Sequence, residues 1–409
     1  MRCAFLTIRM VDRGGLYRRY PTDLPCLVAA IRCGWANRSR RYAIQVFPSL
    51  CAFVCIRNVG IGKAVAETVS EQGFKPKYIL VTGGCGFIGA NFVRYVARNH
   101  PDVHITVLDK LTYAGNPANI DGLPQSQVEL VIGDICDVSL LERIVPGCDA
   151  IVHFAAESHN DNSIFDPEPF IRTNVEGTMR LLEAARKYDV RFHHISTDEV
   201  YGDLALDDPA RFGENSPYRP SSRTARRKPR PTIWCARGRA HTACAPPSPT
   251  VPTITGRTSM WKKFIPRQIT SIMEGVRPKL YGTGENVRDW IHTEDHSSAV
   301  WEILTRGRIG ETYLIGADGE MSNIAVMRMI LRLMGCAEDA FDWVRDRPGH
   351  DRRYAIDSSK LRTELGWKPV RTDFRSRFAS NHRLVCCQPR LVGARQSPPP
   401  KPRYRAQGQ

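Results

Sequence analysis

A glycine-rich run early in the chain has the spacing of a phosphate-binding loop. Gly83, Gly86 and Gly89 stand three residues apart, after the apolar run at residues 78–81 and before a predicted helix. Glycines so placed let the backbone approach a pyrophosphate, which then lies at the N-terminus of the helix. Asp109 ends the next apolar run, where a carboxylate can bind the hydroxyls of an adenosine ribose and would repel a 2′-phosphate. The pattern therefore predicts a dinucleotide site for NAD rather than NADP.

Two adjacent carboxylates form a second candidate site. Asp198 and Glu199 follow Ser196 and Thr197, directly after the apolar run at residues 192–195. Neighbouring carboxyl groups beside a hydroxyl, at the carboxyl end of a strand, suit paired acid and base catalysis. The alternative is a solvated loop in which one of these residues caps a helix.

The elements that must position these residues alternate between strand and helix. Short apolar runs at residues 78–81, 104–108, 128–132, 150–154 and 192–195 predict strands, and residues 91–99 and 174–187 have helical spacing. This order predicts an α/β fold of the Rossmann type, a doubly wound parallel sheet with ligands at the carboxyl ends of its strands. Residues 263–374 predict a smaller α+β region with a hairpin around residues 281–284.

The charge of the chain is unevenly distributed. The net charge is +16, but residues 1–75, 223–262 and 375–409 carry +8, +9 and +8, so the remainder is acidic. The basic segments show no pattern of an amphipathic helix, which disfavours nucleic acid as a partner. No apolar run approaches the ~20 residues that span a bilayer, and no Cys-x-x-Cys pair suggests a metal site.

Several motifs resemble those of the extended short-chain dehydrogenases. They are the glycine loop and residues 109–115, 133–135, 155–159 and 196–202. Residues 277–292 and 347–357 resemble in detail the sugar-nucleotide dehydratases, in particular the dTDP-glucose 4,6-dehydratases. The resemblance extends over residues 76–222 and 263–374. It departs at Asn160 and Asn162, where the commonest pattern has Val and Arg.

The resemblance implies a lyase that converts dTDP-glucose to the 4-keto-6-deoxy sugar and water. Thr197 would bind the C4 oxygen, Asp198 would protonate the departing C6 hydroxyl, and Glu199 would remove the C5 proton. Arg288 would pair with the diphosphate; the alternative is a surface salt bridge. The implied NAD contacts are Gly83, Gly86, Phe87, Ile88, Gly89, Asp109, Lys110, Asp134, Ile135, Ala155 and Ala156. The implied substrate contacts are Ser158, Arg288, His350 and Asp351.

One catalytic group that the resemblance implies is missing. The family's first oxidation uses a Tyr-x-x-x-Lys pair, but Thr224 stands at the tyrosine position, with Lys228 at the lysine position. Codons for the family sequence Pro-Tyr-Ser-Ala-Ser-Lys, read one base along, can encode Arg-Thr-Ala-Arg-Arg-Lys, which is residues 223–228. A run of eight family residues, shifted likewise, gives residues 252–259. We hypothesise that residues 223–262 and part of 375–409 are translated out of frame.

These observations predict the organisation of the chain. Residues 1–75 form an extension outside the fold, 76–262 the NAD-binding domain, 263–374 the sugar-nucleotide region and 375–409 an aberrant tail. We expect residues 223–262 to be extruded or disordered, because their nine cations cannot be buried against a sheet. The family is cytoplasmic and homodimeric through a bundle that includes the replaced helix. The alternatives are an inactive binder of NAD and a nucleotide sugar, or another sugar-nucleotide dehydratase or epimerase.

Overall fold

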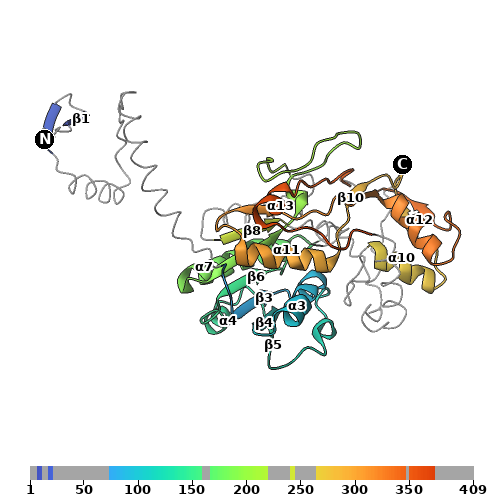
Figure 1. Cartoon of the computed structure of the whole chain (residues 1–409), viewed down its shortest axis with the longest axis horizontal. Helices are drawn as coiled ribbons and strands as arrows, with labels where there is room; N and C mark the ends of the chain where they lie inside the picture. Colours follow the sequence, from blue (N-terminus) through green and yellow to red (C-terminus); the bar gives the residue numbers. More distant parts are fainter. Residues whose placement is uncertain are drawn as a thin grey trace, which may run out of the picture. The chain divides into compact units, whose positions relative to one another are not determined.

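The computed structural model describes residues 7–11, 17–21, 73–158, 166–219, 240–244, 264–346 and 350–373. The chain divides into two compact units, Met1–Gln72 and Gly73–Gln409. In the first unit, β1 (Thr7–Val11) pairs antiparallel with β2 (Tyr17–Pro21). The sheet that carries the candidate site belongs to the second unit (Figure 1).

A seven-stranded parallel sheet forms the centre of the second unit. Its order is β11-β8-β7-β6-β3-β4-β5. The strands are β3 (Tyr78–Thr82), β4 (His104–Asp109), β5 (Val128–Ile132), β6 (Ala150–His153), β7 (Arg191–Ser196), β8 (Ala240–Cys244) and β11 (Thr312–Leu314). The order reverses between β3 and β6, where ligands of doubly wound sheets bind. The five strands predicted from the sequence, and the Rossmann-type fold, are confirmed.

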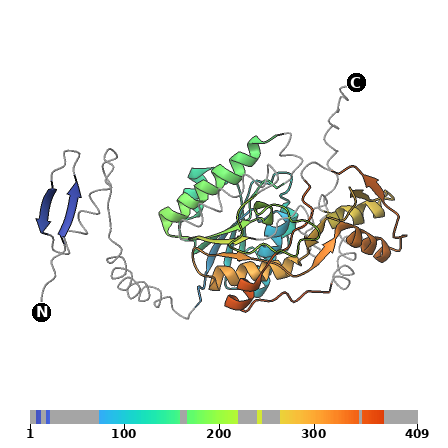
Figure 2. The ribbon, with the colours of Figure 1, turned by 90° about the horizontal axis from the view of Figure 1, so that it is seen from above.

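Helices cover both faces of this sheet. Ile79 and Val81 point to one face, under α3 (Phe87–Asn99) and α11 (Thr293–Arg306), and Leu80 points to the other. That other face is covered by α4 (Val138–Ile144) and α7 (Thr178–Tyr188). Figure 2 shows α7 on one side of the strands and α11 on the other. Burial on both faces explains why the strands read as continuous apolar runs.

Strand β8 corrects one expectation. It pairs in parallel with β7 on one side and β11 on the other. Extrusion of the whole block 223–262 is therefore wrong for Ala240–Cys244, whose sequence Ala-His-Thr-Ala-Cys contains no Lys or Arg. A strand between β7 and β11 satisfies hydrogen-bonding groups that both would otherwise expose. The remainder of residues 223–262 lies outside the described part of the chain.

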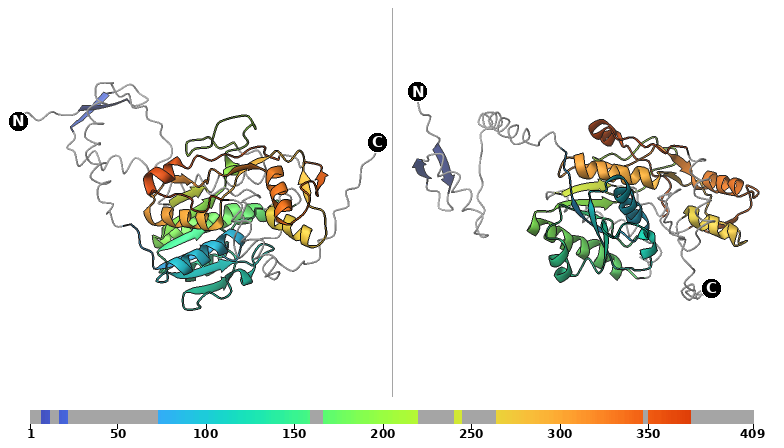
Figure 3. Two further views of the ribbon diagram at one scale, coloured as in Figure 1. Left: turned by 45° about the vertical axis from the view of Figure 1, so that its right-hand side comes forward. Right: turned by 60° about the horizontal axis from the view of Figure 1, so that its bottom comes forward.

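The C-terminal region forms a second layer. Its elements are α10 (Phe264–Met273), β9 (Lys279–Tyr281), β10 (Val287–Asp289), β12 (Glu320–Ser322), α12 (Asn323–Leu333), β13 (Asp342–Val344) and α13 (Ser359–Leu365). Helices α10 and α12 lie side by side (Figure 3) and share a core around Trp290. This region also supplies β11 to the large sheet and α11 to one of its faces, so the hydrogen bonding of the sheet crosses the predicted boundary at residue 263.

The predicted hairpin around residues 281–284 is wrong. A turn is present, with the N–H of Gly284 donating to the carbonyl of Tyr281. However, β9 pairs in parallel with β13 and β10 pairs antiparallel with β12. Both partner strands come from later in the chain, and local spacing cannot reveal them. Among the described residues, no helix is both long and apolar enough to cross a membrane.

Candidate functional site

The glycine loop is packed so closely that side chains would not fit. Gly83 follows β3 with φ +71°, and a Cβ there would lie 2.6 Å from the backbone nitrogen of Ala155. A Cβ on Gly89 would lie 2.3 Å from the carbonyl oxygen of Gly83. Gly86 precedes α3 as its N-cap residue, so the loop leads directly into the helix N-terminus. The backbone is thus shaped as the motif predicts, with the positive end of α3 facing the loop.

A pocket opens over this loop at the switch point of the sheet. Every residue predicted to contact NAD lines it, and so does Ser158. The wall also includes residues that the sequence predictions omitted: Leu108, Thr112, Ala114, Gly115, Gly133, Phe154, Glu157, Thr173, Ile195 and Ser196. Three of these, Thr112, Ala114 and Gly115, stand in the motif at residues 109–115 and could have been included on that signal.

Asp109 is fixed by the loops on either side of it. It is buried, and its carboxylate accepts hydrogen bonds from the N–H of Cys85 at 2.9 Å and of Leu111 at 2.8 Å. Burial raises the pKa of Asp109, and the backbone donors oppose that rise. The carboxylate therefore joins the glycine loop to the end of β4 and lies in the pocket wall.

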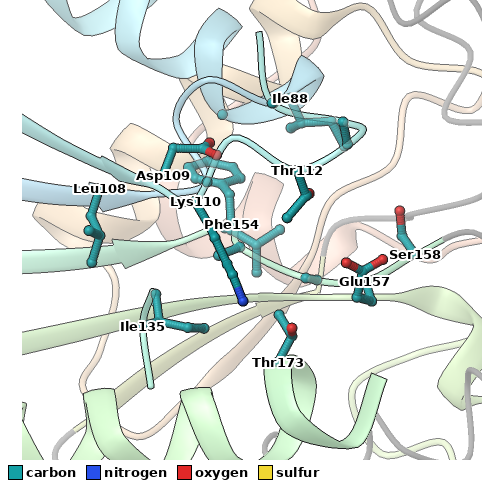
Figure 4. Close-up of a pocket in the computed structure, with 18 of the residues that line it drawn as sticks. Ile88, Leu108, Asp109, Lys110, Thr112, Ile135, Phe154, Glu157, Ser158 and Thr173 are labelled. Atoms are coloured by element: carbon teal, nitrogen blue, oxygen red, sulfur yellow. The ribbon is translucent and has the colours of Figure 1, made fainter. Parts of the chain in front are cut away.

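Asp134 and Lys110 line the pocket, and Arg172 contacts Asp134 from outside the pocket lining. Asp134 accepts from the ammonium of Lys110 at 2.8 Å, from the guanidinium of Arg172 at 3.4 Å, and from the N–H of Cys136 at 3.0 Å. Burial acts to raise the pKa of Asp134, but the Lys110 and Cys136 bonds prevail and lower it. Figure 4 shows Lys110 extending toward the side where Ile135 and Thr173 lie. Lys110, Asp134 and Ile135 are thus brought together, as predicted.

Thr197, Asp198 and Glu199 lie directly beyond Ser196 of the pocket wall. They are 0%, 2% and 4% exposed, so the alternative of a solvated loop is wrong. A short 3₁₀ turn, η4 (Asp198–Val200), follows Thr197, whose hydroxyl accepts from the N–H of Glu199 at 3.3 Å. Burial, followed by the charge of Glu199, raises the pKa of Asp198 to about 8. Asp198 therefore holds a proton at neutral pH.

The C-terminal region places a cation and a further carboxylate beside Asp198. Arg288 is 2% exposed, which excludes a surface salt bridge, and the charges of Arg288 and Asp351 both act on Asp198. Asp351 accepts a hydrogen bond from the hydroxyl of Tyr354, a buried residue that the predictions omitted. His350 lies next in sequence to Asp351, but its Nδ1 is bonded to Asp346 at 2.6 Å.

Two buried polar atoms of this cluster have no hydrogen-bond partner among the residues that the structure describes. They are Oδ1 of Asp198 and Nε of Arg288. Unpaired buried polar atoms cost free energy, and in native proteins they mark places where water or a ligand binds. Asn160, Asn162, Thr224 and Lys228 fall outside the described residues. Within the described part of the chain, no group of three or more His, Cys, Asp or Glu side chains could hold a metal ion.

Comparisons with known proteins agree with this geometry. Residues 80–377 match the family model described as GDP-mannose 4,6 dehydratase. The chain is 54% identical over 299 residues to a dTDP-glucose 4,6-dehydratase of Mycolicibacterium smegmatis, covering 72% of this chain and 89% of the relative. The enzyme of that name from Mycobacterium tuberculosis (strain H37Rv) is 53% identical, with the same coverage.

Solved structures extend the comparison. A dTDP-glucose 4,6-dehydratase of Bacillus anthracis in complex with NAD has a TM-score of 0.70 and 34% identity, covering 77% of this chain and 98% of its own. A dTDP-glucose 4,6-dehydratase of Streptomyces venezuelae with NAD and dTDP bound has a TM-score of 0.70 and 39% identity, covering 76% and 97%. On the evidence of its fold, its pocket and these matches, the chain belongs to the family of dTDP-glucose 4,6-dehydratases.

Proposed function

We propose that the pocket binds NAD and that the adjoining cluster binds dTDP-glucose, which is dehydrated there to the 4-keto-6-deoxy sugar. Residues 76–262 would bind NAD and residues 263–374 the sugar nucleotide. The pocket suits NAD because Gly83 and Gly89 leave room that a Cβ would fill, and because Asp109 lies in its wall. When bound, NAD supplies the hydride acceptor at C4 of the sugar and the hydride donor at C6.

The protein's own residues supply the proton transfers of the water elimination. Glu199 removes the C5 proton, which a ketone at C4 makes acidic, while Asp198 protonates the hydroxyl that leaves C6 as water. Thr197 donates a hydrogen bond to the C4 oxygen. Arg288 binds the diphosphate, Ser158 the sugar, and Lys110, Asp134 and Ile135 the adenosine of NAD. His350 and Asp351 are the remaining residues that contact the substrate.

One observation carries this proposal. Asp198 is 2% exposed, has a pKa raised to about 8, and has an unpartnered Oδ1 beside a second carboxylate. An acid that keeps its proton at pH 7 next to a potential base is the arrangement that elimination of water requires. Burial of an unpaired carboxyl has no evident structural benefit, since a hydrophobic residue would be stabler there.

A second candidate function follows from Thr224. Its hydroxyl is too weak an acid to replace a tyrosine base, so the chain as written would bind NAD and nucleotide sugar without completing the first oxidation. Restoring the reading frame across residues 223–262 should restore both the tyrosine and the helix expected in the homodimer. We place either form of the protein in the cytoplasm.

The test measures binding and turnover on two chains. The full chain and a frame-corrected version are titrated with NAD and with dTDP, then incubated with NAD and dTDP-glucose. We expect both chains to bind both ligands and the corrected chain to form the 4-keto-6-deoxy product. Product from the uncorrected chain would refute the inactive binder, and a corrected chain without product would refute the dehydratase. Resequencing codons 215–270 tests the frame hypothesis, which fails if the DNA needs no correction.

A further inference from the structure

We propose that Tyr354 is a positioning residue for substrate binding, whose ring holds the guanidinium of Arg288 in place for the diphosphate of a nucleotide sugar. The proposal rests on the function proposed above, because it assumes that this cluster binds the nucleotide. It concerns a residue of the C-terminal region that lines no part of the NAD pocket.

The guanidinium of Arg288 is held on several sides. Its central carbon lies 4.5 Å from the centre of the Tyr354 ring. One terminal nitrogen donates to the carbonyls of Val287 at 2.7 Å and Arg352 at 3.2 Å, and the other donates to the carbonyl of Asp351 at 2.8 Å. Nε is buried without a hydrogen-bond partner among the described residues. The side chain is therefore fixed in one orientation with at least one N–H unused.

The charge of Arg288 is not neutralised by an ion pair with any carboxylate in the described residues. Its hydrogen-bond acceptors are carbonyl oxygens and its ring contact is Tyr354, at 2% exposure, although the carboxyl group of Asp198 lies close enough for the two groups to interact electrostatically. A buried cation of this kind is costly unless an anion joins it, and a diphosphate is the anion that a guanidinium binds best. The negative face of an aromatic ring stabilises a desolvated cation until that anion arrives.

Tyr354 is itself fixed from both ends. Its ring lies in the buried cluster that contains Val200 and Tyr201, the residues that follow the Asp198–Glu199 pair. Its hydroxyl donates to the carboxylate of Asp351. Burial, with the charges of Glu199 and Asp351, raises the pKa of Tyr354 well above its usual value, so the hydroxyl remains a donor. Tyr354 thereby joins the acid–base turn to the strand that carries Arg288.

The chain contains a matched arrangement that serves as a control. Tyr313 is fully buried, the ammonium of Lys360 lies 4.5 Å from the centre of its ring, and its hydroxyl donates to Glu364 at 2.9 Å. None of these three residues lines the pocket or acts on Asp198. Loss of the Tyr313 ring removes the same kinds of contact without touching the candidate site.

The experiment measures dTDP and NAD affinities by isothermal titration calorimetry on full-length variants. Tyr354→Leu should weaken dTDP binding about tenfold, the worth of a desolvated cation–aromatic contact, with NAD affinity unchanged. Tyr354→Phe retains the ring and should stay within about threefold of the parent. Tyr313→Leu should lower the melting temperature but leave dTDP affinity at the parental value.

A double-mutant cycle separates positioning from packing. If Tyr354 acts through Arg288, the double variant Tyr354→Leu with Arg288→Met binds dTDP no more weakly than Arg288→Met alone. Additive losses, or parental dTDP affinity in Tyr354→Leu, would overturn the inference.

Two further outcomes are decisive. If Tyr354→Leu also loses NAD affinity, the fold of that variant is damaged. The variant Arg288→Lys is then used for the test in its place. Lysine keeps the charge without the flat face that stacks on Tyr354, so dTDP binding should again weaken, and parental affinity would refute the proposal. A parent chain that binds NAD but not dTDP would refute the proposed function itself. That outcome is distinct from normal parental binding with unaffected variants, which refutes only the role of Tyr354.

Discussion

Burial distinguishes Asp198 from an ordinary aspartate. Its carboxyl group lies among Glu199, Arg288 and Asp351, and the desolvation that raises its pKa to about 8 exceeds the opposing effect of the arginine. A proton donor at neutral pH is thus obtained at the expense of stability, because the ionised form is disfavoured only in the folded chain. Active sites commonly contain residues that destabilise the fold in this way.

This cost predicts a specific pH dependence for Asp198→Asn. In the unfolded chain the aspartate has its ordinary pKa of 3.8, so between about pH 4 and pH 8 only the folded chain holds the proton. The stability of the parent therefore falls as pH rises through this window, by at most about 1.4 kcal/mol per pH unit. Asn does not titrate, so the variant should become progressively stabler than the parent. Urea unfolding at pH 5, 6, 7 and 8 measures this; a constant difference would contradict it.

At the scale of elements, a wide helical turn joins the two walls of the pocket. The π-helix η3 (Arg172–Gly177) follows α6 (Glu168–Ile171) and precedes α7. Arg172 reaches Asp134 on one wall, while Asn174 exchanges two 2.9 Å hydrogen bonds with the backbone of Glu157 on the other. Thr173, between them, lines the pocket. A π-turn that aims consecutive residues at a site is typical of functional positions.

Asn174→Ala should therefore weaken both stability and NAD binding. It leaves the N–H and carbonyl of Glu157 without their partner, at a cost of about 1–3 kcal/mol. Because Glu157 and Thr173 line the pocket, the NAD dissociation constant should rise as well. Asn99→Ala is the control, since Asn99 makes a single exposed bond to Tyr95 at the end of α3. Denaturant unfolding and NAD titration compare the two; equal effects would show that the Asn174 bridge is unimportant.

The elements differ in how far the sequence could predict them. Strands β3 to β7 were predictable because burial on both faces leaves uninterrupted apolar runs. Strand β8 and the pairing of β9 with β13 were not, because their partners come from distant parts of the chain. The roles of Gly83 and Asp109 were predictable because both belong to a motif with characteristic local spacing. The burial of Arg288 and the position of Tyr354 depend on packing between η4 and residues 350–357, which no local pattern contains.

At the scale of the whole molecule, the junction at residues 73–75 shows where the fold begins. Phe74, which lies within the predicted extension 1–75, packs against the core of the sheet. Its N–H donates to the carbonyl of Thr305 at 2.8 Å, and the guanidinium of Arg191 lies 4.5 Å from the centre of its ring. Burial lowers the pKa of Arg191 to about 10, and the guanidinium also donates to the carbonyl of Gly307 at 3.2 Å.

Two truncations test the junction. A chain that starts at residue 73 should retain the melting temperature of the sheet-containing unit and its NAD affinity. A chain that starts at residue 76 lacks Phe74 and should be less stable by about 1–2 kcal/mol, through loss of the cation–aromatic contact and apolar packing. Differential scanning calorimetry of both chains measures this. Equal melting temperatures of the two truncated chains would show that Phe74 does not contribute to stability. Loss of NAD binding in the chain that starts at residue 73 would show that residues 1–72 are needed.

The edge strand β11 has a consequence for synthesis of the protein. It pairs with β8 but belongs to a segment made well after β3 to β7, so the sheet cannot be completed until most of the chain has left the ribosome. Until then the growing chain exposes a sheet edge with unpaired backbone N–H and C=O groups that can pair with another copy. The yield of native protein should thus depend on chaperone supply and translation speed.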